Sequence, residues 1–184
     1  MRVTGGRWRG RRLEPPPGPA RPTTDRVRER LLALLGEGVI GAAAADLCCG
    51  GGALGIEALS RGAAYLELVD IDAAALRAAA ANLARCGAAA GTWRTRRGDA
   101  RRWLRREIAA PRHRWLVVAD PPYRLGIAPA LAELLARLAA AGGLRVAAVE
   151  HAAAEPLGAP APPGWAWRER RAGSTVVSLL EEKA

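Results

Sequence analysis

The stretch Asp120-Pro121-Pro122-Tyr123 carries the side chains best suited to chemistry, because it places a carboxylate and an aromatic ring directly after an apolar run at residues 115–119. Such a run is typical of a buried strand. Proline has no N–H group to extend a β ladder, so the chain must leave the sheet here, at the edge where open α/β sheets bind ligands. The Asp120 carboxylate and the Pro121 carbonyl could accept hydrogen bonds from an aromatic amine and turn its lone pair toward an electrophile. Taken alone, the four residues could equally form a plain turn.

A glycine-rich stretch at residues 46–55 forms the second candidate site. It joins a strand expected at residues 42–48 to a helix expected at residues 52–60, and it contains the pattern Gly50-x-Gly52-x-x-Gly55. Glycines let the backbone pass close beneath a ligand, and a helix N-terminus offers unpaired N–H groups. The pattern matches the dinucleotide-binding fingerprint, which is a weak signal by itself.

Two further acids follow expected strands. Asp70 comes 20 residues after Gly50 and is placed to accept hydrogen bonds from the hydroxyl groups of a ribose. It could instead cap the next helix, although Asp72 fits that role better. Asp99 could accept a hydrogen bond from an adenine amino group, cap the helix that follows it, or do both. Together with Asp120, these carboxylates predict a single cleft at one edge of the sheet.

Strands and helices alternate through most of the chain, which predicts a parallel sheet with right-handed crossovers. Strands are expected at residues 42–48, 65–69, 92–96, 115–119 and 144–149, and helices at residues 52–60, 73–85, 100–108 and 127–140. A further helix should begin at residues 23–25 and end near Leu35. The tail breaks the alternation, because residues 165–171 and 175–180 flank a turn at Gly173 and predict an antiparallel hairpin.

The chain has 184 residues and a net charge of +10, which fits one domain with a polyanionic partner. Residues 1–30 hold nine arginines against three acids, and residues 94–114 hold nine against two. A compositional preference for arginine, with 27 arginines and one lysine, explains the residue type but not this clustering. No apolar run approaches the roughly 18 residues of a membrane span. The start has no signal-peptide pattern and the three cysteines make no disulfide framework, so we expect a cytoplasmic protein.

The basic N-terminus is expected to form a hairpin at residues 2–13, turned at Gly5-Gly6 and tethered by the proline-rich residues 15–19. We therefore divide the chain into a hairpin with its linker at residues 1–20 and one domain at residues 21–184. Trp8 could stack on a nucleic-acid base or pin the hairpin to the body. If the hairpin only grips nucleic acid, the body should fold without residues 1–13.

Four motifs resemble those of class I S-adenosylmethionine (SAM)-dependent methyltransferases, and within them the bacterial family that methylates the N2 amine of a guanine in 16S rRNA. They are Gly5-Gly6-Arg7-Trp8-Arg9-Gly10-Arg11, Arg21-Pro22-Thr23-Thr24-Asp25-Arg26-Val27-Arg28-Glu29, Gly52-Ala53-Leu54-Gly55-Ile56-Glu57-Ala58-Leu59-Ser60-Arg61-Gly62-Ala63 and Asp120-Pro121-Pro122-Tyr123. The glycine turn departs from the family pattern, because Cys48-Cys49-Gly50-Gly51 stands where the family usually has Phe-Ala-Gly-Ser. Asp70 stands where the family usually has Glu.

The resemblance implies a Rossmann-like α/β fold with a mostly parallel seven-stranded sheet, an antiparallel C-terminal hairpin and a small N-terminal β-hairpin. It implies SAM as the cofactor, without a metal, and an exocyclic amine as the target. The implied partner is 16S rRNA within a small-subunit ribosomal particle, with no membrane and no obligate protein partner.

The resemblance also implies roles for individual residues. The catalytic residues would be Asp120, Pro121, Pro122 and Tyr123, with the Tyr123 ring stacked on the target base. The cofactor would lie against Asp46, Cys48, Gly50, Gly52, Asp70, Ile71, Asp99 and Ala100. The RNA would bind Arg7, Trp8, Arg9, Arg11, Arg12, Arg26 and Arg28.

Three other functions are weighed against this one. An adenine-N6 methyltransferase shares Asp-Pro-Pro-Tyr, but it usually carries a target-recognition domain for which 184 residues leave no room. An NAD-dependent oxidoreductase would use the glycine pattern but not residues 120–123. A non-catalytic RNA-binding module would have no need of Asp70, Asp99 and Asp120.

Overall fold

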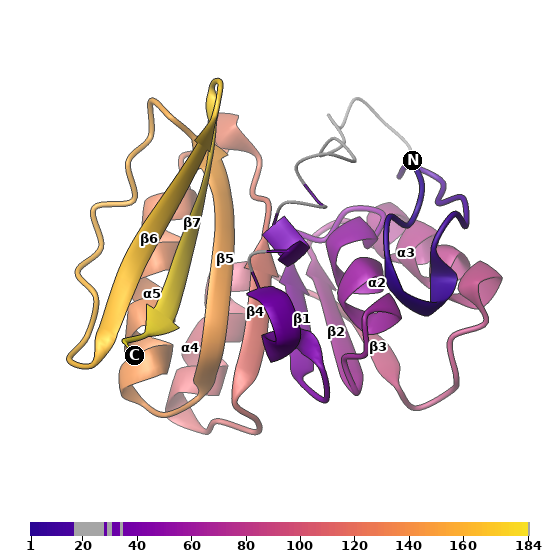
Figure 1. The fold of residues 1–184 in the computed structure, drawn as a ribbon, viewed down its shortest axis with the longest axis horizontal. Coiled ribbons are helices and arrows are strands. Elements are labelled where there is room, and N and C mark those ends of the chain that lie inside the picture. The colour runs from indigo at the N-terminus through magenta and orange to yellow at the C-terminus, as the bar shows by residue number, and fades with distance from the viewer. Residues whose placement is uncertain (17–27, 29–30, 34, 184) are drawn as a thin grey trace.

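The computed structural model describes residues 1–16, 28, 31–33 and 35–183. They form a seven-stranded sheet in the order β3-β2-β1-β4-β5-β7-β6, with helices on both faces (Figure 1). The first five strands are parallel to one another, and β7 is antiparallel to both β5 and β6. The strands are β1 (Ala43–Leu47), β2 (Tyr65–Asp70), β3 (Trp93–Arg97), β4 (Trp115–Ala119), β5 (Leu144–Ala152), β6 (Trp165–Ala172) and β7 (Thr175–Glu182). The predicted mixed sheet with its antiparallel C-terminal hairpin is confirmed.

The helices also lie close to their predicted positions. They are α2 (Ala53–Ser60), α3 (Ala73–Cys86), α4 (Ala100–Ala109) and α5 (Ala128–Ala140), with short 3₁₀ turns η1 (Gly6–Trp8), η2 (Gly36–Val39) and η3 (Tyr123–Leu125). Of the earlier helix expected to end near Leu35, the structure describes Arg28, residues 31–33 and Leu35, all helical. The predicted domain boundary at residue 20 lies outside the described residues.

Strand β5 is three residues longer than predicted, because polar residues at its end have partners from distant parts of the chain. Glu150 and His151 interrupt the apolar run that the sequence pattern relies on. The His151 ring lies 2.8 Å from the Ser178 hydroxyl on β7, and Glu150 accepts a hydrogen bond from the Tyr123 hydroxyl. The pairing with β7 therefore continues to Ala152.

Two hydrophobic cores lie on opposite faces of the sheet. Helices α2 and α3 pack on one face together with the N-terminal segment, residues 1–16, and α4 and α5 cover the other face (Figure 1). Among the described helices, none combines the length and the apolar character that a membrane crossing requires. The alternation of strands and helices thus places each crossover helix on one face of the sheet. The carboxyl ends of the strands are not covered by these helices.

The central strands end level with one another at their carboxyl ends. Leu47, the last residue of β1, pairs with Val69 of β2 on one side and with Ala119 of β4 on the other. The residues that follow these pairs therefore emerge at the same edge of the sheet. This register brings the glycine turn, Asp70 and Asp120 together.

The predicted N-terminal β-hairpin is present in an irregular form. Residues 2–13 run back on themselves, with an antiparallel bridge between Arg2 and Arg12 and a backbone hydrogen bond from the Val3 N–H to the Arg11 carbonyl at 2.9 Å, but the reversal is made by η1 rather than by a two-residue turn. The 3₁₀ turn sits against the end of α2, where the Ser60 hydroxyl accepts a hydrogen bond from the Trp8 N–H at 2.9 Å. Gly6 has φ +74°, and a Cβ atom there would lie 2.0 Å from the Ser60 carbonyl oxygen. Only glycine fits this close approach.

Trp8 belongs to the core and does not present its ring to a ligand. Its exposed fraction is 6%, and Val3 and Leu13 are buried beside it in the same hydrophobic cluster as α2. The prediction that Trp8 stacks on RNA is therefore wrong, and the alternative, that it pins the segment to the body, is correct. Residues 1–13 are part of the domain rather than an appendage to it.

Arg28 is also misassigned as an RNA-binding residue. Its side chain is buried and donates hydrogen bonds to the Arg2 carbonyl at 2.8 Å and to the Met1 sulfur at 3.1 Å. Arg28 therefore holds the first residues of the chain in place. Arg26 lies outside the described residues.

We predict that Trp8→Ala lowers the free energy of unfolding by about 3–5 kcal/mol, as expected for removal of a large buried aromatic side chain. Urea unfolding measures the loss. Arg9→Ala is the matched control, because Arg9 is exposed on the same segment, and its effect should stay within about 0.5 kcal/mol. Equal stability of the two variants would show that the segment is dispensable for folding.

Candidate active site

The structure brings the four predicted acids together around Cys48, at the carboxyl edge of the sheet. Burial, and after it the negative charges of Asp70, Asp46, Asp120 and Asp99, raises the pKa of the Cys48 thiol to about 12. Because the fields of all four carboxylates reach one side chain, the acids line one region rather than separate sites. The thiol is neutral and is not an activated nucleophile.

The glycine turn after β1 has a left-handed backbone at several positions. Cys48 has φ +59°, Gly50 φ +51° and Gly52 φ +78°. A Cβ atom on Gly52 would lie 3.0 Å from the Ala79 methyl carbon, and one on Gly55 would lie 2.7 Å from Leu66 Cδ1. The glycines thus allow the turn to lie close against β2 and α3. Cys48 adopts the left-handed conformation without being glycine, at a cost of roughly 1 kcal/mol.

Asp70 ties the glycine turn to the end of β2. One carboxylate oxygen accepts the Gly50 N–H at 2.9 Å and the other accepts the Asp72 N–H at 2.9 Å. The cap of α3 is Asp72, whose side chain accepts the Ala74 N–H at 2.8 Å. The alternative that Asp70 caps this helix is therefore wrong. A carboxylate has about four acceptor sites, so this half-exposed group can accept further hydrogen bonds from a ligand.

Asp99 does cap α4, as one of the two predicted roles requires. Its side chain accepts hydrogen bonds from the backbone N–H groups of Arg101 and Arg102. The Arg101 guanidinium also binds the carboxylate, at 2.7 Å, and these hydrogen bonds lower the pKa of Asp99. Sequence analysis did not predict this role for Arg101, whose guanidinium group forms an ion pair with the Asp99 carboxylate from the side of the helix.

Asp46 is buried beneath the turn. Its carboxylate accepts the Gly55 N–H at 2.8 Å, which joins β1 to the first turn of α2. Burial raises the pKa of Asp46 to about 8, against the lowering effect of the Gly55 N–H, and the charges of Asp120 and Asp70 add to the rise. Asp46 is therefore largely protonated near neutral pH and positions the turn from below.

Tyr123 is held in place through its hydroxyl group. The hydroxyl donates a hydrogen bond to Glu150 on β5 at 2.9 Å and lies 3.3 Å from the Thr175 hydroxyl on β7. Burial, together with the Glu150 charge, raises the pKa of Tyr123 to about 12, so the phenol stays neutral. Sequence reasoning missed Glu150 and Thr175, because nothing near them in the chain indicates a partner. Pro121 is buried and Pro122 exposed at the same turn.

The N-terminal segment lies against the glycine turn through Asn82 of α3. This fully buried amide accepts the Glu14 N–H at 2.9 Å and donates to the carbonyls of Glu14 at 2.9 Å and Gly51 at 3.0 Å. A Cβ atom on Gly51 would lie 3.1 Å from the Glu14 carbonyl oxygen and 3.2 Å from Pro16. Asn82 thus joins the segment, α3 and the turn, a link that the sequence did not indicate.

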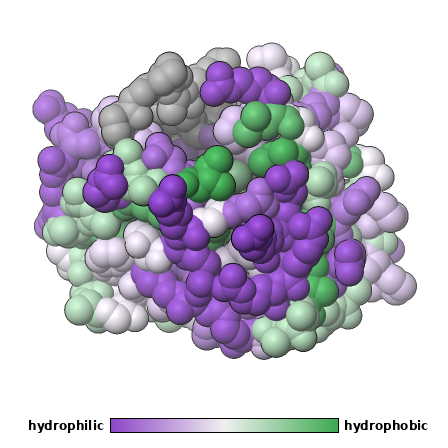
Figure 2. All heavy atoms as spheres, turned by 180° about the vertical axis from the view of Figure 1, so that it is seen from behind, coloured by the Kyte–Doolittle hydropathy of each residue, from purple (hydrophilic) through white to green (hydrophobic). Residues whose placement is uncertain are grey.

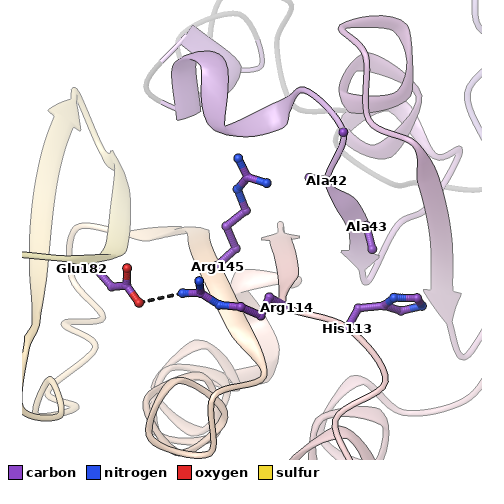
Figure 3. A pocket seen from close by; sticks show the side chains of 7 residues that line it. Ala42, Ala43, His113, Arg114, Arg145 and Glu182 are labelled. Atoms are coloured by element: carbon purple, nitrogen blue, oxygen red, sulfur yellow. Dashed lines mark hydrogen bonds and ion pairs between the residues drawn. The ribbon is translucent and has the colours of Figure 1, made fainter.

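A hollow of about 470 Å³ lies at the opposite edge of the sheet, where the parallel strands begin (Figure 3). An ion pair of 2.6 Å between Arg114 and Glu182 borders it. Its lining residues are Gly41, Ala42, Ala43, His113, Arg114, Arg145 and Glu182. None of the predicted catalytic or cofactor-binding residues is among them, so the hollow is separate from the acid-lined cleft. In the described part of the chain, no group of His, Cys, Asp or Glu side chains is arranged to hold a metal ion.

The sequence pattern of the family described as Conserved hypothetical protein 95 matches residues 1–181. The chain belongs to this family. It is similar to Ribosomal RNA small subunit methyltransferase D of Escherichia coli (strain K12), with 37% identity over 188 residues that cover 100% of this chain and 91% of the relative. It is 38% identical over 127 residues to the Putative rRNA methyltransferase YlbH of Bacillus subtilis (strain 168), covering 67% of each protein. The resemblance stated from the four motifs is confirmed.

Solved structures agree with this family assignment. The putative methyltransferase yhhF from Escherichia coli matches with a TM-score of 0.78 and 33% identity, covering 100% of this chain and 98% of that one. An RNA methyltransferase from Salinibacter ruber, in complex with S-adenosyl-L-homocysteine, matches with a TM-score of 0.60 and 20% identity, covering 89% and 95%. The second match shows a shared fold.

We predict that Asp46→Asn gains stability relative to the wild type as the pH rises. An acid whose pKa is about 8 when folded and 3.8 ordinarily holds its proton more tightly in the folded state. The wild type therefore loses stability between about pH 4 and pH 8, by roughly 1.4 kcal/mol per pH unit, whereas asparagine has no proton to lose. Urea unfolding from pH 4 to pH 9 measures the difference.

Asp99→Asn is the matched control, because the pKa of Asp99 is lowered and its contribution changes only below about pH 4. Its stability difference from the wild type should be constant over the same range. A constant difference for Asp46→Asn as well would contradict a buried, protonated Asp46.

Proposed function

We propose that this protein transfers a methyl group from SAM to the exocyclic N2 amine of a guanine in 16S rRNA. The observation that carries the proposal is the position of Asp120-Pro121-Pro122-Tyr123 beside the glycine turn, at the edge where β1, β2 and β4 end together. Relatives named as rRNA methyltransferases support it over the full chain. SAM supplies the reactive methyl group when it is bound.

The cleft fits a cofactor of this chemistry. The glycine turn has no side chain of its own at residues 50–52, so its backbone can approach a ligand closely, and Asp70 keeps acceptor sites for ribose hydroxyls. SAM carries a sulfonium and an ammonium group, and the carboxylates that surround Cys48 favour positive charge. We propose that Asp46 acts on the cofactor indirectly, by supporting the glycine turn. The residues proposed to contact the cofactor directly are Cys48, Gly50, Gly52, Asp70, Ile71, Asp99 and Ala100.

Asp120 and the Pro121 carbonyl would act on the target amine. The lone pair of an exocyclic amine is delocalised into the ring, so the amine is a poor nucleophile. Two acceptors fixed at its N–H groups orient the lone pair toward the methyl group, and they require no reorganisation at the moment of transfer. Pro122 limits the freedom of the turn, and the tethered Tyr123 offers its ring to the base.

Arginines on the N-terminal segment would bind RNA phosphates near this cleft. Arg7, Arg9, Arg11 and Arg12 are exposed, and the segment that carries them contacts the glycine turn through Asn82. Phosphate contacts of this kind supply affinity without reading sequence. The proposed partner is 16S rRNA, within a small-subunit particle in the cytoplasm.

Transfer of a labelled methyl group from SAM to small-subunit particles and to naked 16S rRNA, followed by nucleoside analysis, tests the proposal. We expect N2-methylguanosine as the product. N6-methyladenosine would show that the site acts on adenine, and the absence of any labelled nucleoside from both substrates would overturn the proposed function.

We predict that Asp120→Asn lowers kcat and kcat/KM together by about 10²–10³-fold, because asparagine is uncharged and can direct an NH₂ group at the target amine. The dissociation constant for SAM should change little. Glu133→Gln, at an exposed position of α5, is the matched control and should retain full activity. A variant whose only defect is weaker SAM binding would contradict the role given to Asp120.

A further inference from the structure

Helix α4 presents a strongly basic face to solvent. Four of its ten residues, at positions 101, 102, 105 and 106, are arginines that lie on the side away from the sheet. The opposite side is buried and carries Trp103, Leu104 and Glu107. The only acid of the helix is therefore turned into the protein, where it binds Arg112 and the Trp115 indole N–H.

Three of these arginines have no carboxylate partner in the described part of the chain. Arg101 is paired with Asp99, but no ion pair joins Arg102, Arg105 or Arg106 to an acid among the described residues. Helix α5 differs, because its exposed face carries Glu133 four residues before Arg137. A general preference for arginine in this chain does not account for a helix face without acids.

The arrangement works against the stability of the helix. Arg101 and Arg105, and likewise Arg102 and Arg106, are like charges at i and i+4, which repel each other on a helix surface. Two of the four also lie in the first turn, where the helix dipole disfavours cations. Like charges that destabilise a helix and are nevertheless gathered on one of its faces are expected where that face binds a ligand of opposite charge.

More arginines continue the surface toward β3. Arg94, Arg96 and Arg112 converge on the buried carboxylate of Glu67, which also accepts the Trp103 indole N–H at 2.8 Å. Burial alone would raise the pKa of Glu67, but these hydrogen bonds lower it to about 2. The side chains of these three arginines, held by Glu67 and, for Arg112, also by Glu107, remain 29–40% exposed. Figure 2 shows this side of the molecule, with hydrophilic side chains gathered across its middle.

The basic surface begins at the cleft. Asp99, which caps α4, is one of the acids whose charge reaches Cys48. The helix then leads away from the cleft over about 15 Å. A ligand that enters the cleft and extends along α4 would meet the arginines in succession.

We propose that this surface, formed by Arg102, Arg105 and Arg106 of α4 with Arg94, Arg96 and Arg112 beside them, binds the phosphate backbone of the RNA substrate beyond the target nucleotide. The inference rests on the proposed function. Guanidinium groups bind phosphates in bidentate geometry, and a row of them suits a polyanion. The large exposed apolar side chains among the described residues are Ile40, Ile71 and Leu125, none of them on α4, so the surface lacks the apolar anchor that a protein partner uses.

Binding of the full-length triple variant Arg102→Gln, Arg105→Gln, Arg106→Gln to transcribed 16S rRNA, titrated over a range of salt concentrations, tests the proposal. Each lost phosphate contact reduces the slope of log affinity against log salt by about 0.7–0.9, so the slope should fall by roughly 2–3. The affinity for S-adenosylhomocysteine should stay the same. The melting temperature should be unchanged or higher, because the repulsion within α4 is removed.

The matched control is Arg145→Gln, Arg170→Gln, Arg171→Gln, which removes the same charge from exposed positions on β5 and β6. Its salt slope should stay close to that of the wild type. An equal loss in both variants would show that only the net charge matters, and an unchanged slope in the α4 variant would exclude this surface; either result overturns the proposal. If the wild type binds rRNA through α4 but transfers no methyl group, the proposed function fails and the binding surface stands.

Discussion

The burial of two carboxylates, Asp46 beneath the glycine turn and Glu67 in the middle of β2, is the constraint on which the site depends. The surroundings of these two buried acids differ, and so does the direction in which the pKa of each is shifted. Glu67 is surrounded by Arg94, Arg96 and Arg112, and its pKa falls to about 2. Asp46 instead has a backbone N–H and two other acids around it, and its pKa rises to about 8. The first arrangement keeps a buried charge paired and holds β2 and α4 together, whereas the second leaves Asp46 as a neutral acid that supports the turn. The negative charge of the cleft therefore comes from the half-exposed Asp70, Asp99 and Asp120.

The glycine turn is the element through which this edge is organised. Asp46 supports it from below, Asp70 binds it from β2, and Asn82 joins it to the N-terminal segment. The same segment is anchored at its other end by Trp8, which is buried against α2. The glycine turn and the basic residues at the chain start therefore belong to one packed unit.

Local patterns predicted the sheet, the glycine turn and the acids at the strand ends, because these features depend on periodicity and on the backbone chemistry of glycine and proline. The errors concern residues whose partners are distant in the chain. Trp8 and Arg28 were expected to bind RNA as parts of a basic segment, yet both are buried, against α2 and against the first residues of the chain. Asn82, Glu150 and Thr175 gave no local signal, since their hydrogen bonds span 68, 27 and 52 residues. Such contacts are fixed only when the fold brings the elements together.

A crystal structure of the protein with S-adenosylhomocysteine would test the central claim, that the acid-lined carboxyl edge is the cofactor site, most directly. The account predicts that the ligand lies on the turn at residues 50–52, with its ribose hydroxyls on Asp70 and its sulfur facing Asp120. A ligand held in the hollow beside Ala42 and Arg145, or one that leaves Asp70 bound only to Gly50 and Asp72, would contradict it.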